Sequence, residues 1–153
     1  MRARTSPIGT AGEYFVAGEL ALRGWTATVT LNQAAGIDVL AAKDGGKTIQ
    51  LQVKATQKVG DADRASWPVS NVLNHGDKDE AWVVLVKLPP AVDASAPEGE
   101  RPVYWIIPRQ QLRRIIESHE GEFTARHGRK PHMNTLSAQW VREFRGVWSL
   151  LEG

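Results

Sequence analysis

Residues 36–56 contain two strand-like segments joined by a turn sequence, and this feature narrows the possible folds more than any other. Residues 36–42 and 48–56 predict two strands, and residues 43–47 read Lys-Asp-Gly-Gly-Lys, which is typical of a hairpin turn. In the second segment, apolar and polar side chains alternate strictly in the order Ile-Gln-Leu-Gln-Val-Lys. The pattern therefore predicts an antiparallel hairpin with one apolar face and one polar face.

The polar face of this hairpin gathers three functional groups. A turn centred on Gly45 places Asp38 opposite Gln52, with Cβ atoms about 5 Å apart. Lys54 follows two residues later and therefore lies on the same face. An Asp inside a strand opposes strand propensity and needs a partner or a metal ion. Two interpretations stay open at this point: an Asp38–Lys54 ion pair on a solvated face, or a site with a chemical role.

The rest of the chain predicts helices near both ends and further strands between them. Helices are expected over residues 9–24, 109–119 and about 136–146, and strands over residues 26–31, 81–88 and 103–107. Residues 57–80 and 120–135 are expected to be irregular, apart from a short strand around residues 67–69. The nearly continuous apolar run at 81–88 is typical of a strand covered on both faces. This order predicts an α/β or α+β sandwich around a central mixed sheet.

Length and composition exclude several classes of protein. A chain of 153 residues suits a single domain. The absence of cysteine excludes disulfide scaffolds, Cys-based zinc sites and thiol nucleophiles. No apolar run approaches the roughly 20 residues that span a bilayer, so no membrane partner is expected. Residues 1–12 lack the apolar segment of a secretory signal, which predicts a cytoplasmic location.

Positive charge is concentrated in the last third of the chain. Residues 1–100 carry ten basic and twelve acidic side chains, whereas residues 101–153 carry nine basic and five acidic ones. Arg favours bidentate phosphate contacts, so this skew favours a nucleic-acid partner over an ordinary solvated surface. The candidate phosphate-binding residues are Arg109, Arg113, Arg114, Arg126, Arg129 and Lys130.

Four short motifs give the hairpin a wider context. They are Gly-x-x-x-Glu at residues 9–13, Gly-Trp at 24–25, Gly-Ile-Asp at 36–38 and Gln-Val-Lys at 52–54. Their order and placement on a helix and two strands resemble the PD-(D/E)XK nuclease superfamily, and in particular its small members such as Holliday-junction resolvases. The likeness covers residues 9–56 and continues more weakly through 81–88. It implies a restriction-endonuclease-like α/β core, with a central mixed sheet flanked by helices in an α-β-β-β-α-β order.

The resemblance also implies a set of site residues. Asp38 matches the metal-binding Asp of the family, Lys54 matches its lysine, and Glu13 matches the helical glutamate that completes the metal site in many members. Gln52 stands where the family usually has Asp or Glu, so one negative charge is missing. The implied ligands of Mg²⁺ or Mn²⁺ are the carboxylates of Glu13 and Asp38, the amide oxygen of Gln52 and the carbonyl of Val53.

Two further positions bear on this assignment. Ile37 replaces the Pro that commonly precedes the family's Asp. Glu19 competes with Glu13 for the helical role, but six residues of helix place the two side chains about 240° apart, so they cannot share one site. Glu13 has the Gly-x-x-x-Glu context and is favoured.

These residues predict a Mg²⁺-dependent endonuclease that hydrolyses phosphodiester bonds, with double-stranded or branched DNA favoured over RNA. The resemblance implies a homodimer or a higher symmetric oligomer, and a single nuclease-like domain over residues 1–153. Its core would span about residues 9–107, and residues 108–153 would form a basic helical part. The first alternative is a nucleic-acid-binding or regulatory module on the same fold with a weakened or inactive site, which the neutral Gln52 keeps open. The second is a protein-interaction protein of the immunity or inhibitor type.

The sequence surroundings of four tryptophans predict where their side chains lie. Trp82, Trp105 and Trp140 lie in apolar patterns and are predicted to be core residues. Trp67 lies in the polar segment 57–80, which makes it the candidate for contact with nucleic acid.

Overall fold

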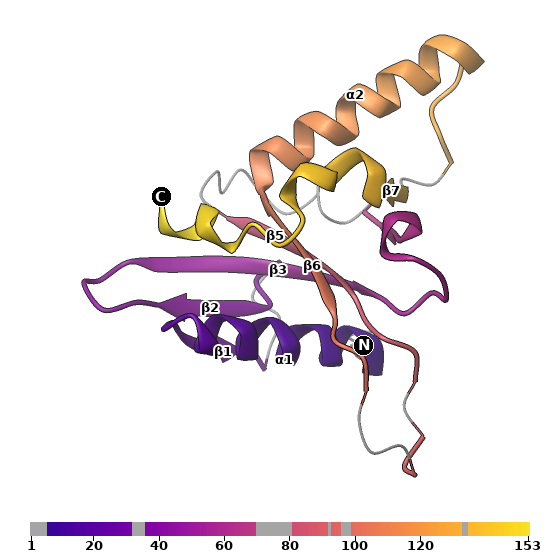
Figure 1. The fold of residues 1–153 in the computed structure, drawn as a ribbon. Coiled ribbons are helices and arrows are strands. Elements are labelled where there is room, and N and C mark those ends of the chain that lie inside the picture. The colour runs from indigo at the N-terminus through magenta and orange to yellow at the C-terminus, as the bar shows by residue number, and fades with distance from the viewer. Residues whose placement is uncertain (1–5, 32–35, 70–80, 92, 96–98, 133–134) are drawn as a thin grey trace.

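A computed structural model describes residues 6–31, 36–69, 81–91, 93–95, 99–132 and 135–153 and places a five-stranded sheet at the centre (Figure 1). In chain order the elements are α1 (Pro7–Leu22), β1 (Thr26–Val29), β2 (Val39–Ala42), β3 (Thr48–Thr56), the 3-10 helix η1 (Ala62–Arg64), β4 (Ser66–Pro68), β5 (Trp82–Lys87), β6 (Val103–Pro108), α2 (Arg109–His127), β7 (Thr135–Ser137), and the 3-10 helices η2 (Ala138–Phe144) and η3 (Trp148–Glu152). The strand order in the sheet is β1-β2-β3-β5-β6, and β4 pairs with β7 separately. β3 and β5 run parallel while the other three pairs of the large sheet are antiparallel, so the predicted mixed sheet is confirmed.

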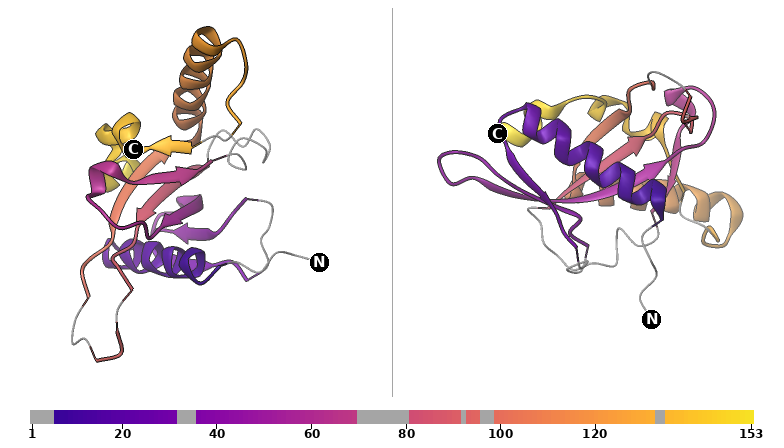
Figure 2. Two further views of the ribbon diagram at one scale, coloured as in Figure 1. Left: turned by 90° about the vertical axis from the view of Figure 1, so that its right-hand side faces the viewer. Right: turned by 90° about the horizontal axis from the view of Figure 1, so that it is seen from below.

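Apolar clusters cover both faces of the sheet. On one face α1 packs on the strands and contributes Leu20 to the first cluster. On the other face α2, η2 and the β4–β7 pair cover a second cluster, to which α2 contributes Leu112. Figures 1 and 2 show α1 and α2 on opposite sides of the sheet. Along β5, Val83 enters the second cluster and Val84 the first, which confirms that this strand is covered on both faces.

The hairpin forms in the predicted register. Val39 pairs with Leu51 and Ala42 pairs with Thr48, which is the alignment expected of a turn centred on Gly45. Gly45 has a φ of 99°, a backbone conformation that glycine adopts without steric cost. The first strand of the hairpin is shorter than predicted, because β2 begins at Val39 and not three residues earlier.

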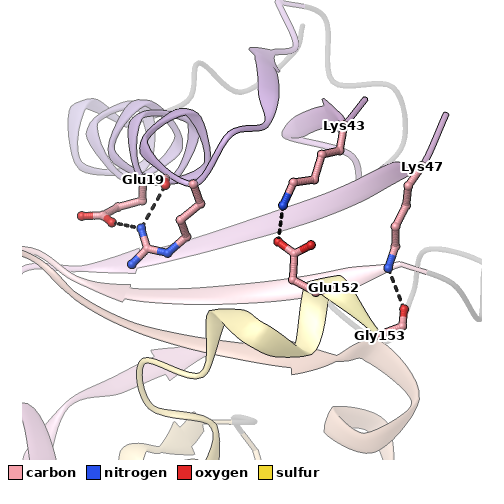
Figure 3. Close-up of polar contacts among 6 residues, drawn as sticks. Glu19, Lys43, Lys47, Glu152 and Gly153 are labelled. Carbon is pink, nitrogen blue, oxygen red and sulfur yellow. Dashed lines mark hydrogen bonds and ion pairs between the residues drawn. The ribbon is translucent and has the colours of Figure 1, made fainter. Parts of the chain in front are cut away.

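The two lysines that flank this turn connect it to the end of the chain (Figure 3). Nζ of Lys43 lies 2.6 Å from a carboxylate oxygen of Glu152, and Nζ of Lys47 donates to the carbonyl oxygen of Gly153 at 2.6 Å. Both contacts are exposed to solvent, so each adds little to stability. They nevertheless hold the hairpin turn beside η3.

Helix α2 is eight residues longer than the prediction of 109–119. It runs through Gly121 and ends at Gly128, whose φ of 66° is the left-handed conformation of a C-terminal cap. A single helical glycine costs only about 1 kcal/mol relative to Ala, so Gly121 weakens the helix without ending it. Neither α2 nor any other helix in the described ranges is both long and apolar enough to cross a membrane.

The prediction of a helix over residues 136–146 is wrong in its bounds and in the type of structure that forms. Residues 135–137 form β7, which pairs antiparallel with β4, and η2 follows as a 3-10 helix with a kink at Val141. Pairing with a distant strand overrides the local helical pattern, which a sequence window cannot detect.

Gly12 allows α1 to pack directly against β3. A Cβ atom at this position would lie 2.7 Å from Cβ of Ala55 and 3.5 Å from a methyl carbon of Val53. The first of these distances is shorter than van der Waals contact, so only glycine permits this approach. The close packing sets the height of Glu13, the next residue, above the sheet.

Replacing Gly12 with Ala should therefore destabilise the protein, although alanine is the better helix former. Overpacking of this kind costs about 1–3 kcal/mol, measurable by urea denaturation. Gly18→Ala is the matched control in the same helix, because a Cβ there meets nothing within 4 Å. Helix propensity alone predicts that the control gains up to about 1 kcal/mol. Equal effects of the two substitutions would contradict the packing account.

Candidate metal centre at the open edge of β3

The candidate site lies where β3 continues beyond the end of its neighbour. β2 pairs with β3 only over residues 48–51 of β3, and β3 continues to Thr56. Beyond this pairing, the backbone N–H of Asp38 donates to the carbonyl of Leu51 at 2.9 Å, which is displaced by one residue from the register in which Val39 pairs with Leu51. Backbone groups two residues apart on a strand point the same way, so the N–H and C=O of Val53 also point toward the β2 side. On that side the N–H of Val53 meets a side chain instead of a neighbouring strand.

That side chain is Asp38. Its Oδ2 accepts a hydrogen bond from the backbone N–H of Val53 at 2.7 Å, and the residue is half-buried. The carboxylate therefore takes the place of the missing strand partner and is held against the edge of β3. The carbonyl of Val53 faces the same side, as the predicted ligand set requires.

Gln52 is the buried polar member of the group. The residue is 5% exposed, and its Oε1 has no hydrogen-bond partner within the described part of the chain. Residues 49, 51 and 53 enter the cluster under α1, so Gln52 projects from the opposite face of β3, as the alternation predicted. An unsatisfied buried oxygen costs about 1–3 kcal/mol and calls for an explanation such as an ion or a water molecule. Coordination to a cation is one such explanation.

Glu13 is electrostatically coupled to Asp38. It lies half-buried on α1, and both burial and the negative charge of Asp38 raise the pKa of Glu13 above its ordinary value. Burial is the larger of the two causes. Two carboxylates that repel each other in this way would both be stabilised by a shared cation.

Glu19 has a different partner. Its carboxylate forms an ion pair with Arg23, and the Arg23 guanidinium also donates to the backbone carbonyl of Glu19 at 2.9 Å (Figure 3). The structure therefore couples Glu13, and not Glu19, to Asp38.

The donor set fits a hard divalent cation. It comprises two carboxylates, one amide oxygen and one carbonyl, which are the oxygen ligands that Mg²⁺ and Mn²⁺ prefer. Among the described residues, no group of three or more His, Cys, Asp and Glu side chains could hold a metal ion. Lys54 lies half-buried on the same face of β3 as Gln52.

The predicted basic surface is only partly exposed. Arg109 is 6% exposed, so the expectation that it contacts phosphate at the surface is wrong. It is the first residue of α2, and its backbone N–H donates to the carbonyl of Ala81 at 3.1 Å, which fixes this end of the helix at the sheet. Arg113 is half-buried. The exposed members are Arg114, Arg126, Arg129 and Lys130.

Two tryptophan assignments are wrong. Trp67 is completely buried, donates to the carbonyl of Val86 at 3.0 Å and contacts the Trp105 ring edge-on, so it cannot contact nucleic acid. The sequence carries a signal for this burial, because Ala65, Trp67 and Val69 lie at every second position, as the apolar residues of a half-buried strand do. All three residues are buried in the structure. Trp105 is a core residue as predicted.

Trp140 is 38% exposed and not a core residue. Its ring stacks on that of His119 with the centroids 3.6 Å apart. Both residues line a groove of about 290 Å³ along α2, together with Ile116 and Phe123. None of the candidate metal ligands lines this groove.

Solved structures show which fold this is. No family model and no curated protein sequence matches the chain. A Holliday junction resolvase from the archaeal hyperthermophile Archaeoglobus fulgidus matches with a TM-score of 0.52 and 13% identity, over 94% of this chain and 95% of that one. A bacterial homing endonuclease matches with a TM-score of 0.53 and 13% identity, over 94% of this chain and 89% of that one. The predicted restriction-endonuclease-like fold is therefore confirmed.

The raised pKa of Glu13 predicts how stability changes with pH. A carboxyl with a raised folded-state pKa contributes stability below its ordinary pKa, and this contribution is lost as the pH rises through the folded-state pKa. Glu13→Gln removes the charge at every pH. In the presence of a chelator, the variant should therefore have a higher Tm than the wild type near neutral pH. The difference should shrink as the pH falls toward about 4.

Thermal unfolding followed by circular dichroism across this pH range provides the measurement. Glu19→Gln is the matched control, because it removes a carboxylate that is paired with Arg23 and should bring no gain at neutral pH. A Glu13→Gln gain that grows toward acid pH would contradict the assigned cause.

Proposed function

We propose that this protein is a metal-dependent endonuclease that hydrolyses phosphodiester bonds at the open edge of β3. One observation carries the proposal: Gln52 presents a buried, unpartnered oxygen on the strand whose edge is capped by Asp38, and Glu13 is coupled to the same carboxylate. The nuclease fold of the two solved structures supports it. Double-stranded or branched DNA is the proposed substrate, because one of those proteins is a Holliday junction resolvase and the other a homing endonuclease.

The chain's own residues would divide the work of hydrolysis. Glu13, Asp38, Gln52 and the Val53 carbonyl would hold Mg²⁺ or Mn²⁺, which supplies Lewis-acid chemistry to the phosphate and acidifies a water molecule. Lys54 would orient the attacking water and stabilise the negative charge that develops on the phosphate oxygens. The water oxygen bonds to phosphorus and gives up a proton to solvent, the bond to the leaving oxygen breaks, and that oxygen takes up a proton from solvent to become a hydroxyl.

The missing carboxylate at position 52 has a consequence for metal affinity. With Glu13 and Asp38 ionised and Lys54 protonated, the empty site carries a net charge of −1, one unit less negative than with an acid at position 52. Such a site attracts a cation more weakly, so activity should require a higher metal concentration. The competing function is nucleic-acid binding without cleavage, by a site that is inactive. The weaker attraction of this site for a cation is the feature that favours this alternative.

The exposed basic residues of α2 and of the segment after it are the proposed contacts for the DNA backbone. Arg114 and Arg126 lie on the helix, and Arg129 and Lys130 lie beyond its C-terminus. Contacts of this kind are sensitive to salt and independent of sequence. The single domain, a homodimer and a cytoplasmic location stay predictions.

Asp38→Asn and Lys54→Met test the proposed chemistry. With Mg²⁺ or Mn²⁺, each variant should cleave duplex or branched DNA at least about 100-fold more slowly than the wild type. Each should bind DNA with an affinity within about threefold of the wild type, since the exposed basic residues proposed to hold the DNA backbone are all retained. Glu19→Gln, a change of similar size on α1, should cleave normally.

Cleavage of a panel of duplex, branched and RNA substrates, together with binding by fluorescence anisotropy, gives both quantities. A wild-type protein that binds DNA and cleaves no substrate would identify the binding module. A wild-type protein that neither binds nor cleaves would favour the protein-interaction alternative.

A further inference from the structure

The second half of α2 carries a row of aromatic side chains that lies beside Trp140. Figure 1 shows this half of the helix extending away from the sheet. His119, Phe123 and His127 follow one another at intervals of four residues, which places them on one side of α2. The ring of Trp140 stacks on His119 with an interplanar angle of 10°, and Phe123 and His127 form a second stack with centroids 4.1 Å apart. All four rings line the groove of about 290 Å³ along this helix, which we call the α2 groove.

The size and the aromatic walls of the α2 groove suit one small flat ring system. Its volume lies at the lower end of the range for small-ligand sites, which is about 300–1,000 Å³. A helix of a partner protein is about 10 Å across and is therefore too wide for it. Trp140 is 38% exposed, whereas four of the other five tryptophans of the chain are buried. Rings that already stack face to face and are open to solvent offer an entering ring the same type of contact.

Charged side chains of both signs also line the α2 groove. They are the carboxylates of Glu120 and Glu122 and the guanidinium of Arg126. A carboxylate accepts hydrogen bonds from the amino groups of a nucleobase, and a guanidinium donates to its carbonyl oxygens and ring nitrogens. The two carboxylates would repel a phosphate inside the groove, since both carry a negative charge. The lining groups therefore suit the edge of a base better than a phosphate.

Cations stand beside the groove, where the backbone of a bound strand would run. The guanidinium of Arg129 lies 5.7 Å from the centroid of the Phe123 ring, and the next residue, Lys130, is exposed. Both belong to the proposed contacts for the DNA backbone. An apolar side chain of a partner protein would gain nothing from these cations and would offer no hydrogen bond to Glu120 or Arg126. Charge complementarity therefore favours a nucleotide.

We propose that the α2 groove binds an unpaired nucleobase of the DNA substrate. The base stacks on the aromatic rings of the groove, while its phosphates stay outside with Arg129 and Lys130. A base inside a duplex is already stacked on both of its faces, so it must leave the duplex before it can reach the groove. The inference rests on the proposed function for its DNA partner, and it narrows the substrate class to DNA that carries unpaired nucleotides.

Fluorescence anisotropy with labelled DNA in the presence of a chelator tests the wild-type protein. Two duplexes are compared that carry the same short single-stranded overhang, one with its bases and one with abasic nucleotides. The overhang with bases should bind at least about fivefold more tightly, because the backbone charge is the same and only base stacking differs. Equal affinities for the two overhangs would overturn the proposal.

Trp140→Ala locates the base on the protein. This variant should lose the preference for the overhang with bases and bind a blunt duplex as the wild type does, whereas Trp140→Phe should keep most of the preference. Phe15→Ala is the matched control and should keep all of it, because Phe15 is an exposed aromatic residue on α1, outside the groove. A Trp140→Ala variant with an undiminished preference would contradict the assignment. Circular dichroism checks that each variant is folded.

The chelator separates this inference from the proposed cleavage, because no metal-dependent hydrolysis occurs during the measurement. A protein that cleaves DNA with Mg²⁺ but does not distinguish the two overhangs would keep the proposed function and overturn the base site. A protein that prefers the overhang with bases and cleaves no substrate would confirm the base site and reject the nuclease.

Discussion

The hydrogen bond from the backbone N–H of Val53 to the Asp38 carboxylate, at 2.7 Å, is the contact on which the rest of the site depends. This hydrogen bond exists because β3 extends beyond the end of β2, so the edge of β3 after Leu51 has no strand partner on that side. The Asp38 carboxylate accepts a hydrogen bond from the backbone N–H of Val53, which would otherwise have no partner from a strand. The same hydrogen bond holds the carboxylate in place. One side chain thus meets a structural requirement of the sheet and also supplies a carboxylate to the proposed site.

Packing between layers brings the second carboxylate to this edge. Gly12 lets α1 approach β3 so closely that Glu13 loses solvent and is affected by the charge of Asp38. Two mutually repelling carboxylates and an unpartnered Gln52 oxygen are unfavourable without a ligand, and the proposed divalent cation would stabilise all three.

Much of the fold could be predicted because its signals are local. The alternation in residues 49–54 and the glycines at the turn determine the register in which residues 39–42 pair with residues 48–51. The predictions that are wrong concern residues whose structure depends on contacts with parts of the chain far away in the sequence. Pairing with β4 makes a strand of residues 135–137, and the β4–β7 layer buries Trp67. The coupling of Glu13 to Asp38 depends on how α1 packs on the sheet, so the sequence could only favour Glu13 over Glu19.

Whether the open edge of β3 binds a metal ion can be seen in a crystal structure of the protein soaked in Mn²⁺, with its anomalous signal recorded. We expect one anomalous peak at this edge, within about 2.5 Å of carboxylate oxygens of both Asp38 and Glu13, with Oε1 of Gln52 turned toward it. No peak there at saturating Mn²⁺, with Glu13 facing bulk water and Asp38 paired with Lys54, would contradict it.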